Sequence, residues 1–426
     1  MPLLALDVRP LRNRDFRIYY TGSAVSSFGS VISFVVIPFQ VAVLTESPFL
    51  VGLLGLCELL PLLITSFIGG ALADYVDRRK LVLWCEVALT ALTALLLLNS
   101  LGGTPQLWAL YVIAALTSGL SGLARPSREA LIPRLVTPEE IPAVSGLQST
   151  YHNISSIGGP ALAGLLLANF PLAWVYAIDL ATFLVSLLCL SLIRAVPPPP
   201  GADRPSVRSV VDGLKYARKR PELLGTYLVD MNAMFFGMPM ALYPFLALKF
   251  GGPQVLGLLH AAPAAGALLA SMTSGWSARV HRHGLMVLLA AGVWGLGVLG
   301  FGLSPTLWMA LLFLALAGFG DMISGLFRGI IWNQTIPDHF RGRLAGIEQL
   351  SYLSGPTLGN LESGIAAKAF GISGSVVFGG VMSLVGTAAL AVWLRPFLKY
   401  DGRDGIERKR AEEAAHAAKS NEHTVS

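Results

Sequence analysis

The sequence predicts an all-α membrane protein that crosses the bilayer repeatedly, with twelve transmembrane helices in two pseudo-symmetric bundles of six. Three observations support this fold class: the composition, the length of the apolar runs and the position of the charged residues. Of the 426 residues, 54% are hydrophobic and 13% are charged, and the mean hydropathy is +0.63. A soluble protein of this size would carry about 25% charged residues. The chain is therefore expected to reside in lipid.

The apolar runs are long enough to cross a bilayer core, which needs about 20 residues of helix. Turn-like segments such as Gly-Gly-Thr-Pro at 102–105 separate neighbouring runs. Twelve spans are predicted in this way: 18–43, 48–72, 81–101, 106–124, 142–168, 172–193, 222–247, 254–278, 285–303, 306–327, 345–369 and 373–394.

The cations lie at the ends of these runs and indicate the orientation. If the N-terminus is cytoplasmic, all of the 31 Lys and Arg residues except Lys249 and Lys368 fall on the cytoplasmic side. Membrane proteins keep positive charge on that side. We therefore expect a multi-pass protein of the cytoplasmic (inner) membrane with both termini in the cytoplasm. The same placement argues against nucleic acid as a partner, which the net charge of +6 alone would allow.

The chain is predicted to divide near its middle. Residues 195–221 contain four consecutive prolines, which form a stiff extended spacer, and then valines and a leucine at helical spacing beside Arg and Lys. This pattern is typical of a basic amphipathic helix on the inner leaflet, and a disordered linker is the alternative. The predicted parts are an N-terminal bundle (1–194), this linker (195–221), a C-terminal bundle (222–399) and a cytoplasmic tail (400–426).

Three short motifs recur in the same order in the two halves, which indicates an internal duplication. Gly-Leu-Ala-Arg at 122–125 returns as Gly-Leu-Phe-Arg at 325–328, Gly-Pro at 159–160 returns at 355–356, and Gly-Ala-Leu-Ala-Asp at 70–74 is echoed by Gly-Trp-Ser-Ala-Arg at 275–279. Secondary transporters are built from such repeats and bind their substrate near the midplane between them.

The segment between the second and third spans concentrates charge at the membrane surface. Its sequence, Gly-Gly-Ala-Leu-Ala-Asp-Tyr-Val-Asp-Arg-Arg-Lys at 69–80, resembles the signature loop G-x-L-A-D-x-x-x-R-[RK]-[RK] of the major facilitator superfamily. The resemblance implies the major facilitator fold and a conformational latch. In that latch Asp74 lies against the start of span 11, Arg78 holds Asp74, and Gly70 allows close helix approach. The alternative is that these charges only set the topology.

Further segments are similar to those of one subgroup of this superfamily, the bacterial drug:proton antiporters with the enterobactin exporters and macrolide efflux proteins. They are Arg-Pro-Ser-Arg-Glu-Ala-Leu-Ile-Pro at 125–133, the proline-rich centre, and Arg-Gly-Arg-Leu-Ala-Gly at 341–346. The resemblance implies efflux of a drug-like or siderophore-like small molecule, coupled to protons, by alternating access.

The fifth predicted span carries a second motif. The run at 155–164 resembles the antiporter signature G-x-x-x-G-P-x-x-G-G through Gly159, Pro160 and Gly164, with Ser155 and Ala163 in place of glycines. In the superfamily this motif accompanies export with proton exchange. The alternative is a generic packing face, because small residues let helices approach closely in lipid.

Ionisable residues within spans are costly and therefore mark functional candidates. Glu58 is about 15 Å into span 2 and Asp230 about 12 Å into span 7, at 1.5 Å per residue. These two acids, one from each half, are the first candidates for proton coupling. Polar residues at similar depth are candidates for the same role or for substrate binding: His152, Asn153 and Asn232. A structural hydrogen bond between helices is the alternative for each. Five other residues are placed nearer to span ends and outside the first set: Asp179, His260, Asp321, Glu348 and Glu362.

Arg125 and Arg328 end spans 4 and 10 in the repeated motif. At the cytoplasmic ends of these spans they could attract an anionic substrate or pair with acids near Asp74, and topology anchoring is the alternative.

The absence of several motifs argues against other classes of protein function. The sequence has no nucleotide-binding loop, no metal-ligand cluster and no nucleophile motif, so we expect no enzyme activity, no metal and no cofactor. The expected partners are a small-molecule substrate, protons and membrane lipids, and the chain is expected to act as a monomer. The alternatives are an importer or lipid flippase on the same fold, or a transport-dead membrane sensor.

Overall fold

A computed structural model of the full chain describes residues 7–72, 76–194, 216–218 and 220–425. Within these ranges the side chains of residues 71, 338–339, 341–343, 345–347, 349–350 and 415–425 are not described. The described part is helical, with no strands in these ranges.

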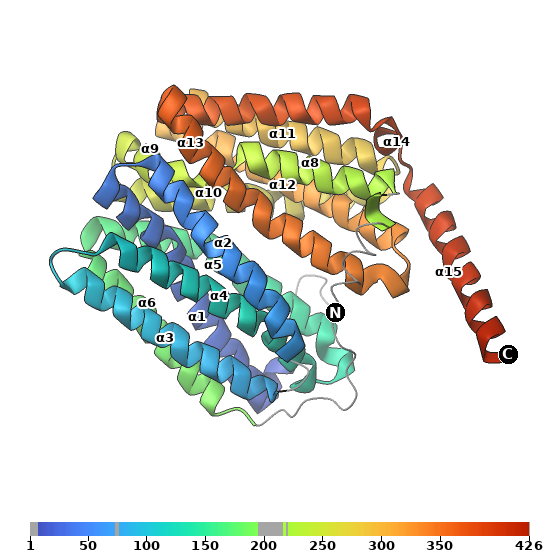
Figure 1. Cartoon of the computed structure of the whole chain (residues 1–426), viewed down its shortest axis with the longest axis horizontal. Helices are drawn as coiled ribbons and strands as arrows, with labels where there is room; N and C mark the ends of the chain where they lie inside the picture. Colours follow the sequence, from blue (N-terminus) through green and yellow to red (C-terminus); the bar gives the residue numbers. More distant parts are fainter. Residues whose placement is uncertain (1–6, 73–75, 195–215, 219, 426) are drawn as a thin grey trace. The chain divides into compact units, whose positions relative to one another are not determined.

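The first half contains six long helices, which match the first six predicted spans (Figure 1). They are α1 (Arg14–Thr45), α2 (Pro48–Leu72), α3 (Arg78–Leu101), α4 (Leu107–Leu131), α5 (Ile141–Asn169) and α6 (Leu172–Ser191).

The second half contains α8 (Pro221–Gly237), α9 (Tyr243–Phe250), α10 (Pro253–Met272), α11 (His283–Leu303), α12 (Leu307–Thr335) and α13 (Asp338–Trp393). The helices α8 and α9 together cover predicted span 7. The last two predicted spans are joined in α13, which is interrupted at Gly371 (φ 72°, ψ 172°), a conformation that glycine adopts readily. Ten helical segments of the described chain are long and apolar enough to cross a membrane, and this arrangement is consistent with twelve spans.

Local sequence explains where several helices begin and end. The Asn13 side chain accepts hydrogen bonds from the backbone N–H groups of Asp15 and Phe16, which caps α1. The Asp77 side chain accepts from Lys80 N and caps α3 in the same way. Helix α1 ends at Thr45 and is followed by Glu46, which adopts the left-handed conformation (φ 51°).

The chain forms two compact units. Unit 1 comprises Met1–Pro205 and Met240–Ala261, and unit 2 comprises Ser206–Pro239 and Ala262–Ser426. The boundary therefore falls within α10, next to Pro263, so that α9 and the first part of α10 belong to unit 1. The division into two bundles, a linker and a tail that the sequence suggests stays a prediction, and residues 195–215 of the linker lie outside the described residues.

In unit 1, α2 packs on α4, α1 packs on α5 and α6, and α3 packs on α4 and α6. A core of Phe16, Val82, Leu131, Leu147 and Leu190 fills the space at one end of these helices. In unit 2, α11 packs on α12 and α13, and α13 packs on α8. The core of unit 2 includes Val229, Phe327 and Phe397, each buried completely.

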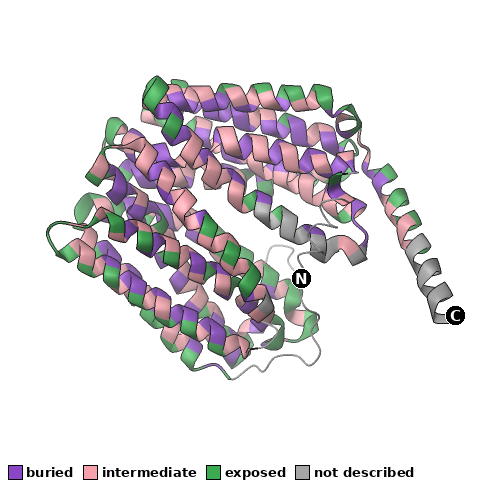
Figure 2. Ribbon diagram, viewed as in Figure 1, coloured by how far each residue is buried: buried purple, intermediate pink, exposed green. Residues whose placement is uncertain are grey.

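The outer faces of the helices are apolar rather than polar. Large apolar side chains such as Trp84, Met272 and Trp308 are 71%, 76% and 77% exposed, and green outer faces run along the helices of both units in Figure 2. Side chains of this kind are stable on a surface that faces lipid. The chain is therefore a multi-pass membrane protein.

Candidate functional site

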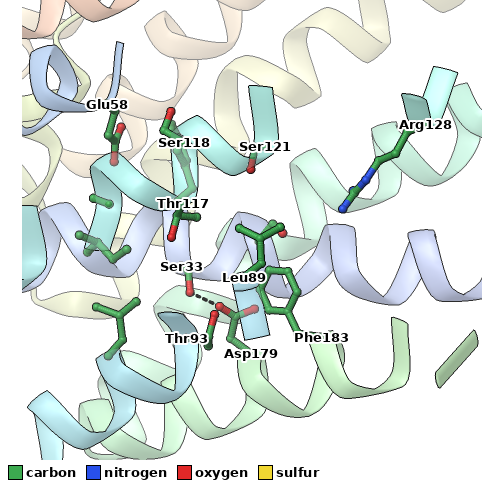
Figure 3. Close-up of a pocket in the computed structure, with 15 residues that line it drawn as sticks. Ser33, Glu58, Leu89, Thr93, Thr117, Ser118, Ser121, Arg128, Asp179 and Phe183 are labelled. Carbon is green, nitrogen blue, oxygen red and sulfur yellow. Dashed lines mark hydrogen bonds between the residues drawn. The ribbon is translucent and has the colours of Figure 1, made fainter. Parts of the chain in front are cut away.

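Unit 1 contains a cavity of about 230 Å³ between helices α1, α2, α3, α4 and α6 (Figure 3). Two acids line it, Glu58 from α2 and Asp179 from α6, and Arg128 from α4 lies at its edge. Six hydroxyl side chains complete the polar lining: Ser30, Ser33, Thr93, Thr117, Ser118 and Ser121. A cavity with this lining can hold a cation, a proton donor or a small polar molecule.

Asp179 is the most deeply buried acid of this cavity, with 1% of its surface exposed. Ser33 Oγ on α1 donates a hydrogen bond to its Oδ2 atom, drawn as a dashed line in Figure 3, and Thr182 Oγ1 lies 3.4 Å from Oδ1. Gly29 allows this arrangement, because a Cβ atom at that position would collide with the Asp179 and Thr182 side chains. Asp179 therefore joins α1 to α6 at a point where the two helices are in close contact.

The sequence places Asp179 nearer to a span end and outside the first set of candidates. The helix α6, from Leu172 to Ser191, begins where the predicted span begins, and within it Asp179 lines the cavity. Depth along the span alone did not identify Asp179 as a lining residue. Glu58 lines the same cavity and is partly buried, as its predicted depth in span 2 suggested. Its role in proton coupling stays a prediction.

A buried ion pair lies beside the cavity. Arg128 Nη2 on α4 lies 2.5 Å from Glu86 Oε2 on α3, and the Glu86 side chain is 1% exposed. Sequence reasoning did not select Glu86, because it interrupts an apolar run near the start of span 3, where charge is common. Sequence reasoning could have identified Glu86 from the presence of an arginine, Arg128, in a neighbouring helix, because a buried acid needs a cationic partner.

Unit 2 contains a cluster of one arginine and two acids. Arg328 Nη1 on α12 lies 2.6 Å from Asp230 Oδ1 on α8, and Arg328 Nη2 lies 3.9 Å from Asp321 Oδ1 on α12. The Asp230 and Arg328 side chains are 7% and 17% exposed, whereas Asp321 is 43% exposed. We call Asp230, Asp321 and Arg328 the unit 2 triad. The sequence selected Asp230 and Arg328 separately, and the structure brings them together.

Arg328 and Asp321 lie farther from a helix end than the sequence predicts. The apolar run of span 10 ends close to residue 327. The helix α12 nevertheless continues to Thr335, because polar residues such as Asn333 and Gln334 can extend a helix beyond its apolar part. Arg328 is therefore an interior residue of α12. Similarly, α4 continues past Arg125 to Leu131. Arg125 is half-exposed and pairs with Glu129 one turn later, at 3.1 Å.

The other polar candidates occupy different surroundings. The Asn232 amide donates to Ser383 O at 2.9 Å and to Thr387 Oγ1 at 3.3 Å, so it ties α8 to α13 within unit 2. His152 and Asn153 are exposed on α5 in unit 1. The structure thus brings neither of them to the cavity or to the triad, and a substrate role for any of these three residues stays a prediction.

The latch residues are only partly described. Asp74 lies outside the described residues, so its contact with span 11 stays a prediction. Arg78 Nη1 donates to Ala130 O on α4 at 3.3 Å. A Cβ atom at Gly70 would have no neighbour within 4 Å in the described chain, whereas one at Gly69 would meet Leu123 Cα at 2.9 Å. The close approach of α2 to α4 therefore occurs at Gly69 rather than at Gly70.

The glycines of the antiporter-like motif lie at helix contacts within unit 1. A Cβ atom at Gly159 would come within 2.7 Å of Val31 Cγ1 on α1. A Cβ atom at Gly164 would come within 2.8 Å of Gly257 N on α10, and one at Gly257 would collide with Pro160 O. The motif thus forms packing contacts with α1 and with the part of α10 in unit 1. Whether it also serves proton exchange stays a prediction.

Comparison with known proteins identifies the family. Residues 6–422 match the family described as transmembrane secretion effectors. The enterobactin exporter EntS of Citrobacter koseri is 27% identical over 377 residues, which is 87% of this chain and 90% of that protein. EntS of Shigella boydii is 27% identical over 383 residues, or 88% of this chain and 91% of that protein.

Solved structures confirm the fold. A bacterial homologue of the human lysosomal transporter Spinster aligns with a TM-score of 0.70 and 14% identity, over 94% of this chain and 99% of that chain. A bacterial homologue of the iron transporter ferroportin aligns with a TM-score of 0.66 and 17% identity, over 90% of this chain and 98% of that chain. These relatives are transporters. The chain belongs to the transmembrane secretion effector family, and it is a transporter of the major facilitator superfamily.

Proposed function

We propose that this protein is a secondary active exporter that moves a drug-like or siderophore-like small molecule out across the cytoplasmic membrane in exchange for protons. The direction and the substrate class are supported by the relatives named as enterobactin exporters, which match most of the chain. The proposal covers this chemical class of substrate rather than enterobactin itself.

The proton coupling rests on one observation, the arrangement of Arg328 between two carboxylates. Asp230 and Asp321 together carry one more negative charge than Arg328 neutralises. A net charge that is buried in a low-dielectric interior costs several kcal/mol. One proton makes the triad neutral, and its exposed member, Asp321, can exchange that proton with water more readily than the buried Asp230.

Protonation would also change which helices are joined. In the structure Arg328 links α12 to α8 through Asp230. If the proton is on Asp230, the remaining carboxylate is that of Asp321, and the ion pair then lies within α12. Proton uptake would therefore release α8 from α12, and proton loss would restore their connection. Alternating access needs such a helix contact that has two states.

The decisive experiment is transport in proteoliposomes that hold the purified protein, with a panel of fluorescent drugs and siderophores as substrates. An imposed pH gradient should drive each accepted substrate against its concentration gradient, and a protonophore should abolish the effect. Flux that ignores the pH gradient would remove the coupling. Accumulation in the opposite direction would indicate an importer, movement of a fluorescent lipid would indicate a flippase, and no flux of any substrate would favour a sensor.

A further inference from the structure

Asp179 differs from every other buried acid in the described chain. Five Asp and Glu residues are buried there, and four of them have an arginine partner: Asp15 with Arg194 at 3.2 Å, Glu86 with Arg128 at 2.5 Å, Glu222 with Arg220 at 3.0 Å and Asp230 with Arg328 at 2.6 Å. Asp179 has no basic side chain within ion-pair distance in the same ranges. Asp179 is therefore the buried acid of the described chain that has no ion-pair partner.

The hydrogen bond from Ser33 favours the ionised form of Asp179. Ser33 Oγ donates to Oδ2, so this carboxylate oxygen acts as an acceptor, whereas the Thr182 hydroxyl donates to the Asp179 backbone carbonyl at 2.7 Å. A hydroxyl that donates its hydrogen keeps two lone pairs on its oxygen. The Ser33 oxygen can therefore bind a cation while its O–H group still donates to Asp179. A buried carboxylate in this state requires a positive charge nearby.

A second and independent observation is the state of Thr93. Its residue surface is only 5% exposed, it lines the same cavity from α3, and its hydroxyl makes no hydrogen bond with the described residues. Serine and threonine within helices commonly bond to the carbonyl one turn earlier, and Thr65, Thr90 and Thr150 do so here. The Thr93 oxygen is thus available to a ligand in the cavity.

We propose that this cavity binds a sodium ion, held by the Asp179 carboxylate and the hydroxyl oxygens of Ser33 and Thr93. Hard cations prefer oxygen ligands from carboxylates, other oxygen donors and water. The proposed ligand set carries one negative charge, because Glu58, the other acid of the cavity, is not among the ligands, and this favours a monovalent ion over a divalent one. The three ligands come from α1, α3 and α6, so a bound ion would fasten these helices together within unit 1.

The site is separate from the proposed proton triad, which lies in unit 2, and the inference does not depend on the substrate or on the direction of transport. A sodium site and a proton site also differ in the number of ligands that they need. A proton would bind to one oxygen of Asp179, whereas a sodium ion needs several oxygen ligands, which Asp179, Ser33 and Thr93 can supply.

The test is thermal unfolding of the purified full-length protein in detergent, in NaCl, KCl, MgCl2 or choline chloride at matched ionic strength and from pH 6 to pH 8.5. Sodium should raise the melting temperature by several degrees in a saturable manner, and potassium, magnesium and choline should not. Binding of radioactive sodium measures the same site directly. Asp179→Asn and Thr93→Val should each weaken that binding about tenfold or more, which corresponds to about 1.4 kcal/mol.

The matched control is Glu129→Gln, which removes an exposed carboxylate from α4 in unit 1 and should leave sodium binding unchanged. If Asp179→Asn does not fold, Thr93→Val and Ser33→Ala carry the test, since neither changes a charge. The proposal is wrong if the wild-type protein shows no sodium-specific stabilisation or binding. It is equally wrong if stability follows pH alone, as for a simple proton site, or if magnesium replaces sodium. Proton-driven efflux in sodium-free liposomes would survive any of these results.

Discussion

Arg128 and Arg328 lie equally far along α4 and α12, although the repeated sequence motif matches Arg328 with Arg125. The helix α4 begins at residue 107 and α12 at residue 307, and the two arginines follow these starts by the same number of residues. Each contacts a buried carboxylate, Glu86 or Asp230. The partners lie on helices that do not correspond, because α3 is the third helix of its half and α8 the first of its own. Of these two arginines, only Arg328 has a second carboxylate, that of Asp321, within 4 Å among the described residues.

This difference predicts that Asp230 serves coupling. Asp230→Asn leaves Arg328 with one carboxylate, so the remaining pair is neutral without a proton. We expect the initial rate of pH-driven accumulation to fall by about tenfold or more in this variant, a barrier change of about 1.4 kcal/mol. It should still exchange labelled for unlabelled substrate across the membrane, because that exchange needs no net proton movement. Flux of a labelled substrate in proteoliposomes, with and without a pH gradient, measures both.

The control is Glu86→Gln, which alters the matching arginine pair of unit 1 without touching the triad. The transport rate of this variant, divided by the amount of protein in the membrane, should still depend on the pH gradient. If Asp230→Asn still accumulates substrate in proportion to the pH gradient, the triad does not carry the proton, and the other intramembrane acids, Glu58 first, become the candidates.

A second prediction concerns stability in unit 1. Glu86→Gln leaves the guanidinium of Arg128 without its carboxylate partner. Breaking a fully buried ion pair costs about 3–5 kcal/mol, and Arg128 is one-third exposed, so a loss of about 1.5–3 kcal/mol is expected, as for a hydrogen bond to a charged group. The melting temperature in detergent should fall accordingly.

The exposed pair Arg125–Glu129 on the same helix supplies the comparison. Pairs of this kind, one helical turn apart, contribute about 0.3–0.5 kcal/mol, so Glu129→Gln should leave the melting temperature nearly unchanged. Equal shifts in the two variants would contradict the assignment of Glu86 as a buried partner.

The third prediction separates glycines that pack from glycines that do not. Gly257→Val places a side chain against the backbone of Pro160 and Ala161 on α5, which has little room to move. Overpacking of this kind costs about 1–3 kcal/mol, so this variant should reduce folded protein in the membrane. Gly70→Ala meets no described neighbour and should express normally. The readout is the monodisperse fraction after detergent extraction, and normal folding of Gly257→Val would show that α5 and α10 separate more easily than their contact suggests.

Much of the fold could be predicted from the sequence, because apolar runs of about 20 residues have few alternatives to helix in lipid. The six long helices of the first half overlap the predicted spans closely. The helix ends could not be predicted as well. Apolar composition stops near residue 124 in α4 and near residue 327 in α12, whereas the helices continue through polar residues outside the apolar core.

The same difference in helix ends explains why parts of the site could not be predicted. The apolar pattern places Arg328 at a span end, where a pairing with Asp230 is not expected. For Asp179 the reason is different, because depth along a span does not show which side chains line a cavity. Pairing between helices depends on which faces meet, and a single sequence does not specify this. Asp230 and Glu58 could be selected because depth along a span can be counted from its ends without knowledge of packing.

The fourth prediction concerns the latch in the loop between α2 and α3. Asp74→Asn removes the charge that is expected to stabilise the start of span 11, an effect of about 0.3–1 kcal/mol for an acid near a helix N-terminus. Transport should fall several-fold while the amount of protein in the membrane stays normal. Asp77→Asn is the matched control, since the Asp77 side chain caps α3 and its amide replacement can still accept a hydrogen bond. Wild-type flux in Asp74→Asn would remove Asp74 from the mechanism.

The fifth prediction concerns the C-terminal helix α15 (Gly402–Val425), which continues from α14 (Arg395–Leu398) in Figure 1. The buried Arg220, which directly precedes α8, pairs with Glu222 at 3.0 Å and with Glu412 on α15. Tyr216 also donates to Glu412, at 3.0 Å. These contacts make the first part of the tail a structural component of unit 2.

Arg220→Ala should therefore destabilise unit 2 most, by about 3 kcal/mol, the lower end of the range for a broken buried pair, because Glu222 is 5% exposed and keeps only Arg408, at 3.6 Å. Glu412→Gln should cost less, about 1.5–3 kcal/mol, since Arg220 keeps Glu222. The control is Glu413→Gln, whose partner Lys409 lies one turn earlier on the same helix, at 3.7 Å. Melting temperatures that rank the three variants in this order would support the role of α15. If Glu412→Gln and Glu413→Gln behave alike, α15 does not stabilise unit 2 through Arg220.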